Sequence, residues 1–166
     1  MLINKLLNLG NKFYVETMSY KRLQTRAKDT TINEKTGRIN KKKRFGKSLA
    51  NKAPSMFLTM LDNKLKYNGE KLYKIDTAKC RASQYNHFSD EYNKKELKER
   101  WNKDVDIQRD CYSAFLIMNV NEDLKSINRE LCIDTYDNFK VLHDKEISRL
   151  KKLKLNGYKL ISSMGI

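Results

Sequence analysis

Two short segments alternate hydrophobic and polar residues in the way that a strand does. Residues 12–16, KFYVE, combine Phe, Tyr and Val, which suit a pleated surface, and predict a strand that ends at Glu16. Residues 71–76, KLYKID, predict a second strand. A helical turn is expected after the first strand, because the side chain of Ser19 can cap it.

The clearest helical pattern lies between these strands. Residues 48–67 carry hydrophobic side chains at the spacing of one helix face, namely Met56, Phe57, Met60, Leu61 and Leu65. Pro54 sits where such a helix can begin, since the first turn does not need the N–H that proline lacks. Asn68 and Gly69 supply a left-handed cap at its end.

Residues 77–105 are polar and irregular as far as KKELKERW, residues 94–101, whose pattern is that of a helical piece. Helices are then predicted over 109–119, 122–132 and 136–155. The last of these has an imperfect inward stripe that includes His143, Glu146 and Ile147. Strand, helix and strand followed by further helices predict an α/β domain in which helices cover a sheet.

The charge of the chain narrows the class of partner. Its 166 residues carry a formal net charge of +15, and the isoelectric point is near 9.7. A field of that sign gathers polyanions, so nucleic acid is the first partner to consider. Residues 1–75 hold 18 Lys and Arg against 5 Asp and Glu, whereas residues 76–166 hold 17 against 15. The first part is the expected contact surface, and residues 28–47 predict a loop or a poorly ordered basic segment.

The cysteines and the hydropathy exclude several classes of protein. The three cysteines, Cys80, Cys111 and Cys132, include no CxxC pair, so neither a disulfide framework nor a zinc site is expected. No stretch approaches the roughly 18 apolar residues of a membrane span, and the opening residues lack a signal-peptide cleavage site. We expect a cytoplasmic bacterial protein with reduced thiols and no membrane partner.

Two acids stand out by position, Glu16 at the end of an apolar strand and Asp110 at the head of an apolar helix. Acids are common in the first helical turn, where they interact favourably with the helix dipole, and strand ends are usually solvated. The alternative is a metal site, because hydrolysis of a phosphodiester by two Mg²⁺ ions needs carboxylates that rigid elements hold together. Both interpretations remain open from the pattern alone.

A family resemblance bears on this choice. The stretch FYVETMSYKRLQ, residues 13–24, resembles the second RuvC motif of transposon-encoded OrfB/TnpB proteins, which are RNA-guided nucleases related to type V CRISPR effectors. IQRDCYSAFLIMN, residues 107–119, resembles their third motif. The basic loop, helix and strand within residues 41–76 resemble the segment that joins the two motifs. Order and spacing agree over roughly residues 1–130.

The resemblance implies a partial RNase H-like (RuvC) domain with C-terminal helices. Glu16 falls on the second catalytic acid of the family and Asp110 on the third, so both would ligate Mg²⁺, with Arg109 as the adjoining arginine. The first acid of the family lies on an earlier strand, upstream of this sequence. We therefore expect a chain that is inactive alone or that needs a complementing N-terminal chain, and a sheet edge that invites such pairing or homo-oligomerisation.

The implied organisation has four parts: 1–76, the RuvC-like segment with the basic loop and long helix; 77–105, an insert at the zinc-ribbon position; 106–132, the third-motif helix region; 133–166, a C-terminal helical tail. Neither ASQYNHFSDEY (82–92) nor NKDVDIQ (102–108) has the cysteines of a zinc ribbon, so no zinc is expected. We expect His87 to be a surface residue and His143 to be structural. The aromatic residues of the insert can form a small core or stack on unpaired bases.

Taken together, these features predict the DNA-binding C-terminal part of a TnpB-like, transposase-associated RNA-guided DNA endonuclease, whose partners are DNA and a guide RNA. Phosphate contacts are expected from one set of basic residues: Lys41, Lys42, Lys43, Arg44, Lys47 and Arg109. The rival hypothesis is a non-catalytic basic RNA-binding module, in which neither Glu16 nor Asp110 has a role in metal binding.

Overall fold

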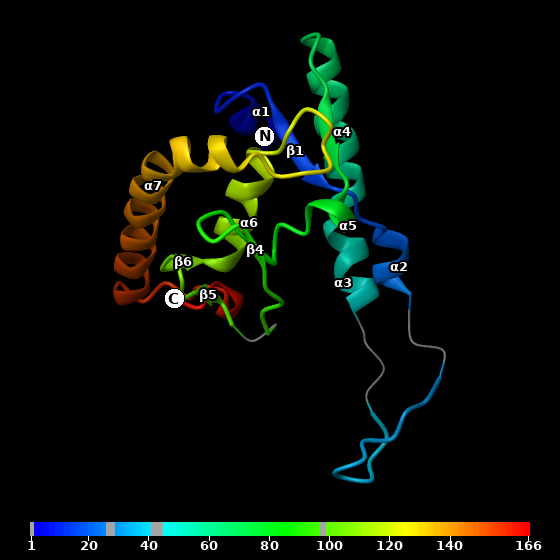
Figure 1. Ribbon diagram of the computed structural model, residues 1–166. Coiled ribbons are helices and arrows are strands. Elements are labelled where there is room, and N and C mark those ends of the chain that lie inside the picture. The colour runs from blue at the N-terminus through cyan, green and yellow to red at the C-terminus, as the bar shows by residue number, and fades with distance from the viewer. Residues whose placement is uncertain (1, 26–28, 41–44, 97–98) are drawn as a thin grey trace. The chain divides into compact units, whose positions relative to one another are not determined.

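A computed structural model describes residues 2–25, 29–40, 45–96 and 99–166, without the side chains of residues 45–48 and Ser163 (Figure 1). The chain divides into two compact units. The first comprises Met1–Phe13 and Thr17–Leu72, and the second comprises Tyr14–Glu16 and Tyr73–Ile166. Each unit is described by itself below.

The described residues form helices and small sheets, so the α/β character predicted from the sequence is present. The helices are α1 (Leu2–Leu7), α2 (Tyr20–Gln24), α3 (Phe45–Lys52), α4 (Pro54–Tyr67), α5 (Thr77–Cys80), α6 (Arg109–Met118), α7 (Arg129–Leu155) and the 3-10 helix η1 (Ser162–Met164). The strands are β1 (Phe13–Glu16), β2 (Leu72–Ile75), β3 (Tyr85–Asn86), β4 (Glu91–Tyr92), β5 (Trp101–Asn102) and β6 (Ile107–Gln108). They pair as three two-stranded sheets, β1 with β2, β3 with β4 and β5 with β6.

Helix α4 of the first unit has the two ends predicted from the sequence. It begins at Pro54, and Ala53 before it takes a left-handed conformation with φ 42°. A residue that precedes proline is disfavoured in the right-handed helical region, which separates α3 from α4. At the other end, Gly69 has φ 74° and its N–H donates to the carbonyl of Lys66 at 3.0 Å. The fully buried Leu65 lies in the last turn.

The strand predictions are also confirmed, and the second unit builds on them. Tyr14 of β1 and Tyr73 of β2 stack with ring centroids 4.9 Å apart. Helix α2 follows β1 with Ser19 as its cap, as predicted, and the Ser19 hydroxyl accepts from the N–H of Arg22. The core of the second unit gathers buried residues from β2, α5, β3, β6, α6, α7 and the loops between them: Ile75, Cys80, Ala82, Tyr85, Val105, Ile107, Tyr112, Phe115, Leu116, Val120, Ile127 and Cys132.

The helical piece predicted over residues 94–101 is wrong for the residues that the structure describes there. Residues 94–96 and 99–100 have no regular structure, and Trp101 begins β5, which pairs with β6 in an antiparallel hairpin. The guanidinium of Arg109 donates to the carbonyls of Glu96 and Glu99, both at 3.2 Å. Because a distant side chain holds these carbonyls, the local helical pattern does not decide the conformation.

The helix predicted over residues 122–132 is wrong in its first part. Residues 121–128 form a turn closed by the pairing of Val120 with Ile127. The Asp123 carboxylate accepts from the N–H of Lys125 at 2.9 Å, and Asn128 caps α7 by accepting from the N–H of Leu131 at 3.0 Å. Short polar side chains that bond nearby backbone compete with a helix. Helix α7 therefore begins at Arg129 and includes the helix predicted over 136–155.

The prediction that His87 lies on the surface is wrong. His87 is fully buried, and its Nδ1 lies 2.6 Å from the Tyr112 hydroxyl, which also accepts from the His87 N–H at 3.2 Å. Nε2 of the ring has no hydrogen-bond partner in the described part of the chain. Arg129 completes the contact by donating to the His87 carbonyl at 2.9 Å. Burial, and then the Arg129 charge, lower the pKa of His87 to about 4.

No helix within the described ranges is long and apolar enough to cross a membrane. Helix α7 has 27 residues but carries charged side chains along its whole length.

The buried imidazole predicts an acid-sensitive second unit. A histidine has a pKa near 6.5 in the unfolded chain and about 4 in this fold, so the unfolded state binds more protons between these values. The contribution of His87 to the free energy of unfolding is fully present above pH 6.5. It is lost as the pH drops towards 4, and the loss is roughly 3 kcal/mol. Urea unfolding followed by Trp101 fluorescence from pH 7 to 4.5 measures it.

The matched control is His87→Gln, whose amide can still accept from the Tyr112 hydroxyl but does not titrate. Other groups contribute equally to both proteins. A variant whose stability falls as steeply with acid as that of the parent would exclude His87 as the source.

Candidate functional site

The two predicted acids lie at the predicted ends of their elements, and both belong to the second unit. Glu16 is the last residue of β1 and is half-buried. Asp110 is the second residue of α6, and its side chain is 64% exposed. Within the described residues, the two carboxylates share no hydrogen-bond partner.

Gln108 organises the start of α6 around Asp110. Its side-chain oxygen caps the helix by accepting from the N–H of Cys111 at 2.8 Å, and its amide nitrogen donates to Asp110 at 3.4 Å. Its backbone N–H donates to Nε2 of His143 on α7 at 3.2 Å. The first turn of α6 is thus fixed to α7, and the Asp110 carboxylate is left at the solvent-facing end of a fixed helix.

Arg109 makes its hydrogen bonds within the protein, and its predicted contact with phosphate stays a prediction. Its side chain is only 16% exposed, and its guanidinium donates to the carbonyls of Glu96 and Glu99. It also lies 3.8 Å from the Asp110 carboxylate. A guanidinium held in this way fixes the loop before β5 and partly balances the charge of Asp110.

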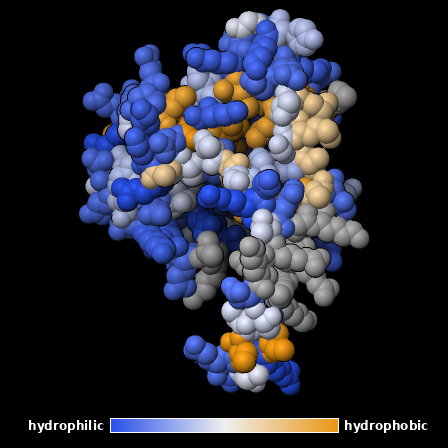
Figure 2. Space-filling model, turned by 90° about the vertical axis from the view of Figure 1, so that its right-hand side faces the viewer, coloured by the Kyte–Doolittle hydropathy of each residue, from blue (hydrophilic) through white to orange (hydrophobic). Residues whose placement is uncertain are grey.

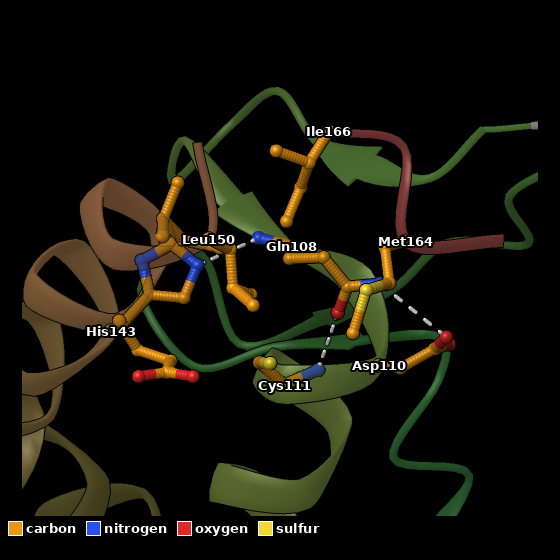
Figure 3. A pocket seen from close by; sticks show the side chains of 9 residues that line it. Gln108, Asp110, Cys111, His143, Leu150, Met164 and Ile166 are labelled. Atoms are coloured by element: carbon orange, nitrogen blue, oxygen red, sulfur yellow. Dashed lines mark hydrogen bonds between the residues drawn. The ribbon is translucent and has the colours of Figure 1, made fainter. Parts of the chain in front are cut away.

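Asp110 also lines a pocket of about 250 Å³ between α6, α7 and the C-terminal segment (Figure 3). The lining combines two carboxylates with apolar side chains: Asp110, Glu146, Ile147, Leu150, Met164 and Ile166. Figure 3 shows Asp110 at one end and Leu150 and His143 at the other. The carboxylates provide oxygen ligands at the rim, and the apolar wall keeps part of the cavity free of polar groups.

Two carboxylates at this pocket act on the thiol of Cys111. Burial raises the pKa of the Cys111 thiol, and the charges of Asp110 and Glu146 raise it further. Both carboxylates therefore act at the same point, although Arg149 pairs with Glu146 at 2.6 Å. A thiol with a raised pKa is a poor nucleophile at neutral pH, so Cys111 is not prepared for covalent catalysis.

His143 is structural, as predicted. Its side chain is 2% exposed, and Nε2 accepts from the Gln108 N–H, so Nδ1 donates to Asp144 at 2.9 Å. Both ring nitrogens are occupied within the protein, so neither is available to a metal. Glu146, on the next turn of α7, was visible in the sequence as an acid within an otherwise apolar stripe, whereas nothing in the sequence indicated the role of Gln108.

The C-terminal segment is held against the rest of the second unit by three contacts. The Trp101 indole donates to the carbonyl of Gly165 at 2.8 Å, and Lys154 donates to the carbonyl of Ile166 at 2.6 Å. Gly165 has φ 68°, and a Cβ added to it would lie 2.5 Å from Cβ of Arg100. The position of residue 165 beside Arg100 therefore accepts only glycine. The contacts of Gly165 place Met164 and Ile166 on the wall of the pocket.

The predicted phosphate contacts lie mostly outside the described residues. Lys41, Lys42, Lys43 and Arg44 belong to this group, and Lys47 lies in α3. Their role stays a prediction.

Metal binding is constrained but not decided by the geometry. In the described ranges, no three or more His, Cys, Asp or Glu residues are grouped so that they could hold a metal ion. Mg²⁺, however, usually keeps several waters and needs only one or two carboxylates from the protein. Asp110 and Glu16 remain candidate ligands of that kind.

Comparisons with protein-family models, with curated proteins and with solved structures found no match to this chain.

The seat of Gly165 predicts how the C-terminal segment can be released. In Gly165→Ala, the new methyl group would clash with Arg100, and the backbone at this position has a positive φ that residues with a side chain rarely adopt. The C-terminal segment should therefore leave the pocket wall. The Trp101 indole then loses its carbonyl partner, and its fluorescence emission should shift to longer wavelength. Cys111 lines this pocket and should then react faster with a maleimide. Cys80 and Cys132 stay buried, so the reaction reports on Cys111.

Gly157→Ala is the matched control. Gly157 also has a positive φ, 84°, but an added Cβ meets nothing within 4 Å. Equal spectra and equal thiol reactivity for Gly165→Ala and Gly157→Ala would show that backbone strain, and not the clash with Arg100, explains any change.

Proposed function

We propose that this chain is the nucleic-acid-binding C-terminal part of a TnpB-like, RNA-guided DNA endonuclease with an RNase H-like (RuvC) catalytic domain. Its partners in this proposal are DNA and a guide RNA. Glu16 and Asp110 would each ligate Mg²⁺, and the chain alone would lack a complete catalytic site.

The observation that carries the proposal is the placement of the two acids. Glu16 closes a strand and Asp110 opens a helix, and both positions belong to one compact unit. The start of that helix is fixed by Gln108 and Arg109, which leaves the Asp110 carboxylate exposed. A metal ligand must be accessible and also fixed in position, and Asp110 meets both conditions. An acid that is only solvated at the surface does not need a fixed backbone.

In the proposed reaction, Mg²⁺ held by these two acids would supply Lewis-acid activation of a water and of the scissile phosphate. Glu16 and Asp110 contribute charge and oxygen ligands. A further carboxylate would come from another strand, either of a longer chain or of a complementing one. The sheet of β1 and β2 has only two strands in the described part of the chain, so such a strand would have an edge to join.

A basic RNA-binding module without catalysis is the second candidate. The excess of Lys and Arg over Asp and Glu in residues 1–75 favours it, because this charge binds phosphate without needing a metal. In this alternative Asp110 is an acid in the first turn of α6 that is stabilised by the helix dipole, and its loss changes nothing in metal affinity.

One variant tests the phosphate contacts that both candidates share, and a second variant separates the candidates. Lys41→Ala/Lys42→Ala/Lys43→Ala should weaken binding to DNA and RNA, and should reduce the slope of log K against log salt by about 3 if each lysine contacts one phosphate. Asp110→Asn keeps the shape of the side chain but removes its charge, so it should lower affinity for Mn²⁺, used as a paramagnetic substitute for Mg²⁺. Fluorescence anisotropy and electron paramagnetic resonance measure the two effects.

Glu130→Gln is the control for the acid, because Glu130 also lies in the first turn of its helix and is exposed. If Asp110→Asn and Glu130→Gln bind Mn²⁺ as the parent does, the metal site is refuted and the binding module is favoured. An unchanged salt slope in the lysine variant would refute the phosphate contacts common to both candidates.

A further inference from the structure

Residues 29–40, predicted only as a loop, contain a small β-hairpin in the first unit (Figure 1). The N–H of Asn33 donates to the carbonyl of Arg38, and the N–H of Asn40 donates to that of Thr31, both at 2.8 Å. The Asn33 side chain accepts from the N–H of Lys35 at 3.0 Å, and Gly37 takes φ 64° to close the turn. Hairpins of this length depend on such a turn.

The hairpin presents two isoleucines side by side. Ile32 and Ile39 are paired as antiparallel neighbours between two hydrogen-bonded pairs, the position where opposed side chains come closest. They point to the same face of the ribbon and are 63% and 69% exposed. Figure 2 shows hydrophobic atoms among hydrophilic ones at the lower end of the view, where Figure 1 draws this segment.

The surroundings of this pair are polar, and they include both basic and acidic side chains. Every residue from 29 to 40 is exposed, so nothing in the described structure covers the isoleucines. Lys35 and Arg38 have no hydrogen bond or ion pair from their side chains within the described residues. Their charges are therefore available to a ligand, and the only acids in the segment are Asp29 and Glu34.

We propose that Ile32 and Ile39 form a wedge that inserts between adjacent bases of DNA, while Lys35 and Arg38 contact the flanking phosphates. The inference rests on the proposed function in one respect, the binding of DNA by this part of the chain. It adds what the hairpin does there, which is to unstack one base step.

Charge complementarity favours nucleic acid over the other possible occupants. The hairpin holds two basic and two acidic residues, but residues 41–47, which follow it in the sequence, hold five Lys and Arg and no acid. The phosphate backbone is the polyanion that such an excess of positive charge recruits. A membrane surface also attracts basic residues, but two isoleucine side chains bury little area compared with the apolar face of an interfacial helix. A protein interface needs a much larger patch than this ribbon presents.

The side chains also have the right mechanical character. Isoleucine is branched at Cβ and is therefore stiff at χ1, so the wedge does not fold away when it meets a base pair. Proteins that kink DNA insert apolar side chains of this kind at base steps, and flexible pyrimidine–purine steps such as TA unstack at the lowest cost. The hairpin is marginal by itself, so contact with DNA would also order it.

The test uses the full chain and a duplex with 2-aminopurine, a base whose fluorescence rises when it is unstacked, next to a central TA step. The parent should raise this fluorescence on binding. Ile32→Thr/Ile39→Thr keeps the β-forming character of both positions and should reduce the rise at least threefold, with affinity about tenfold lower and an unchanged salt slope.

Three controls define the cause. Ile32→Val/Ile39→Val keeps an apolar wedge and should retain most of the signal. Leu9→Thr, which changes another exposed apolar residue of the same unit, should behave as the parent. Lys35→Ala/Arg38→Ala should lower the salt slope, because it removes two phosphate contacts.

The outcomes separate this inference from the function on which it rests. Tight, salt-dependent binding with the same 2-aminopurine signal in the parent and the threonine variant overturns the wedge and leaves the proposed function standing. Absence of DNA binding by the parent overturns both. Binding to phosphatidylserine vesicles that the threonine variant loses, without any change in DNA unstacking, assigns the hairpin to a membrane surface and overturns the wedge.

Discussion

The hydrogen bond from the Gln108 backbone to the His143 imidazole is the constraint on which the candidate site depends. It joins the start of α6 to the middle of α7, two elements that the sequence places far apart. Because His143 is buried and its other ring nitrogen is held by Asp144, the acceptor cannot turn away. This contact also fixes the position of Asp110, because Asp110 follows Gln108 by two residues and accepts a hydrogen bond from the Gln108 side-chain amide.

The insert between β2 and α6 packs around a second buried histidine. His87 lies among aromatic rings, with ring centroids 4.0 Å from Phe88 and 5.0 Å from Tyr136. Its hydrogen bond with Tyr112 connects the insert to α6, and Arg129 connects it to α7 by donating to the carbonyls of His87 and Phe88. A polar contact of this kind specifies one packing, because a shift of the insert would leave a buried imidazole unpaired. Of the two uses open to the aromatic residues of the insert, a local core describes Tyr85, which is 4% exposed, better than Phe88, which is 49% exposed.

The elements that the sequence predicted well are those with local signals. Ser19, Pro54 and Gly69 each act on residues within one turn, so their effect could be inferred without the fold. The ends of β1 and α6, and hence the positions of Glu16 and Asp110, followed from the same kind of signal. The misplaced helices at 94–101 and 122–132 were decided by side chains acting on backbone groups, from a distance in the case of Arg109 and from nearby polar residues in the case of Asp123. The pocket could not be predicted at all, because Met164 and Ile166 reach it only through the seat that Trp101 and Arg100 provide for Gly165.

In the proposed function, one chain attracts both a polyanion and a divalent cation, which a field of one sign alone would not do. Residues 76–166, which contain Asp110 and Glu146, hold nearly equal numbers of acids and bases, and the basic excess lies in residues 1–75. Near Asp110 the neighbouring guanidinium of Arg109 is occupied by two carbonyls and lies 3.8 Å away, so it reduces the negative potential without closing the carboxylate to a further cation. The phosphate of a bound nucleic acid would then add negative charge beside the acids, which makes a divalent cation more favourable there when the substrate is present than when it is absent.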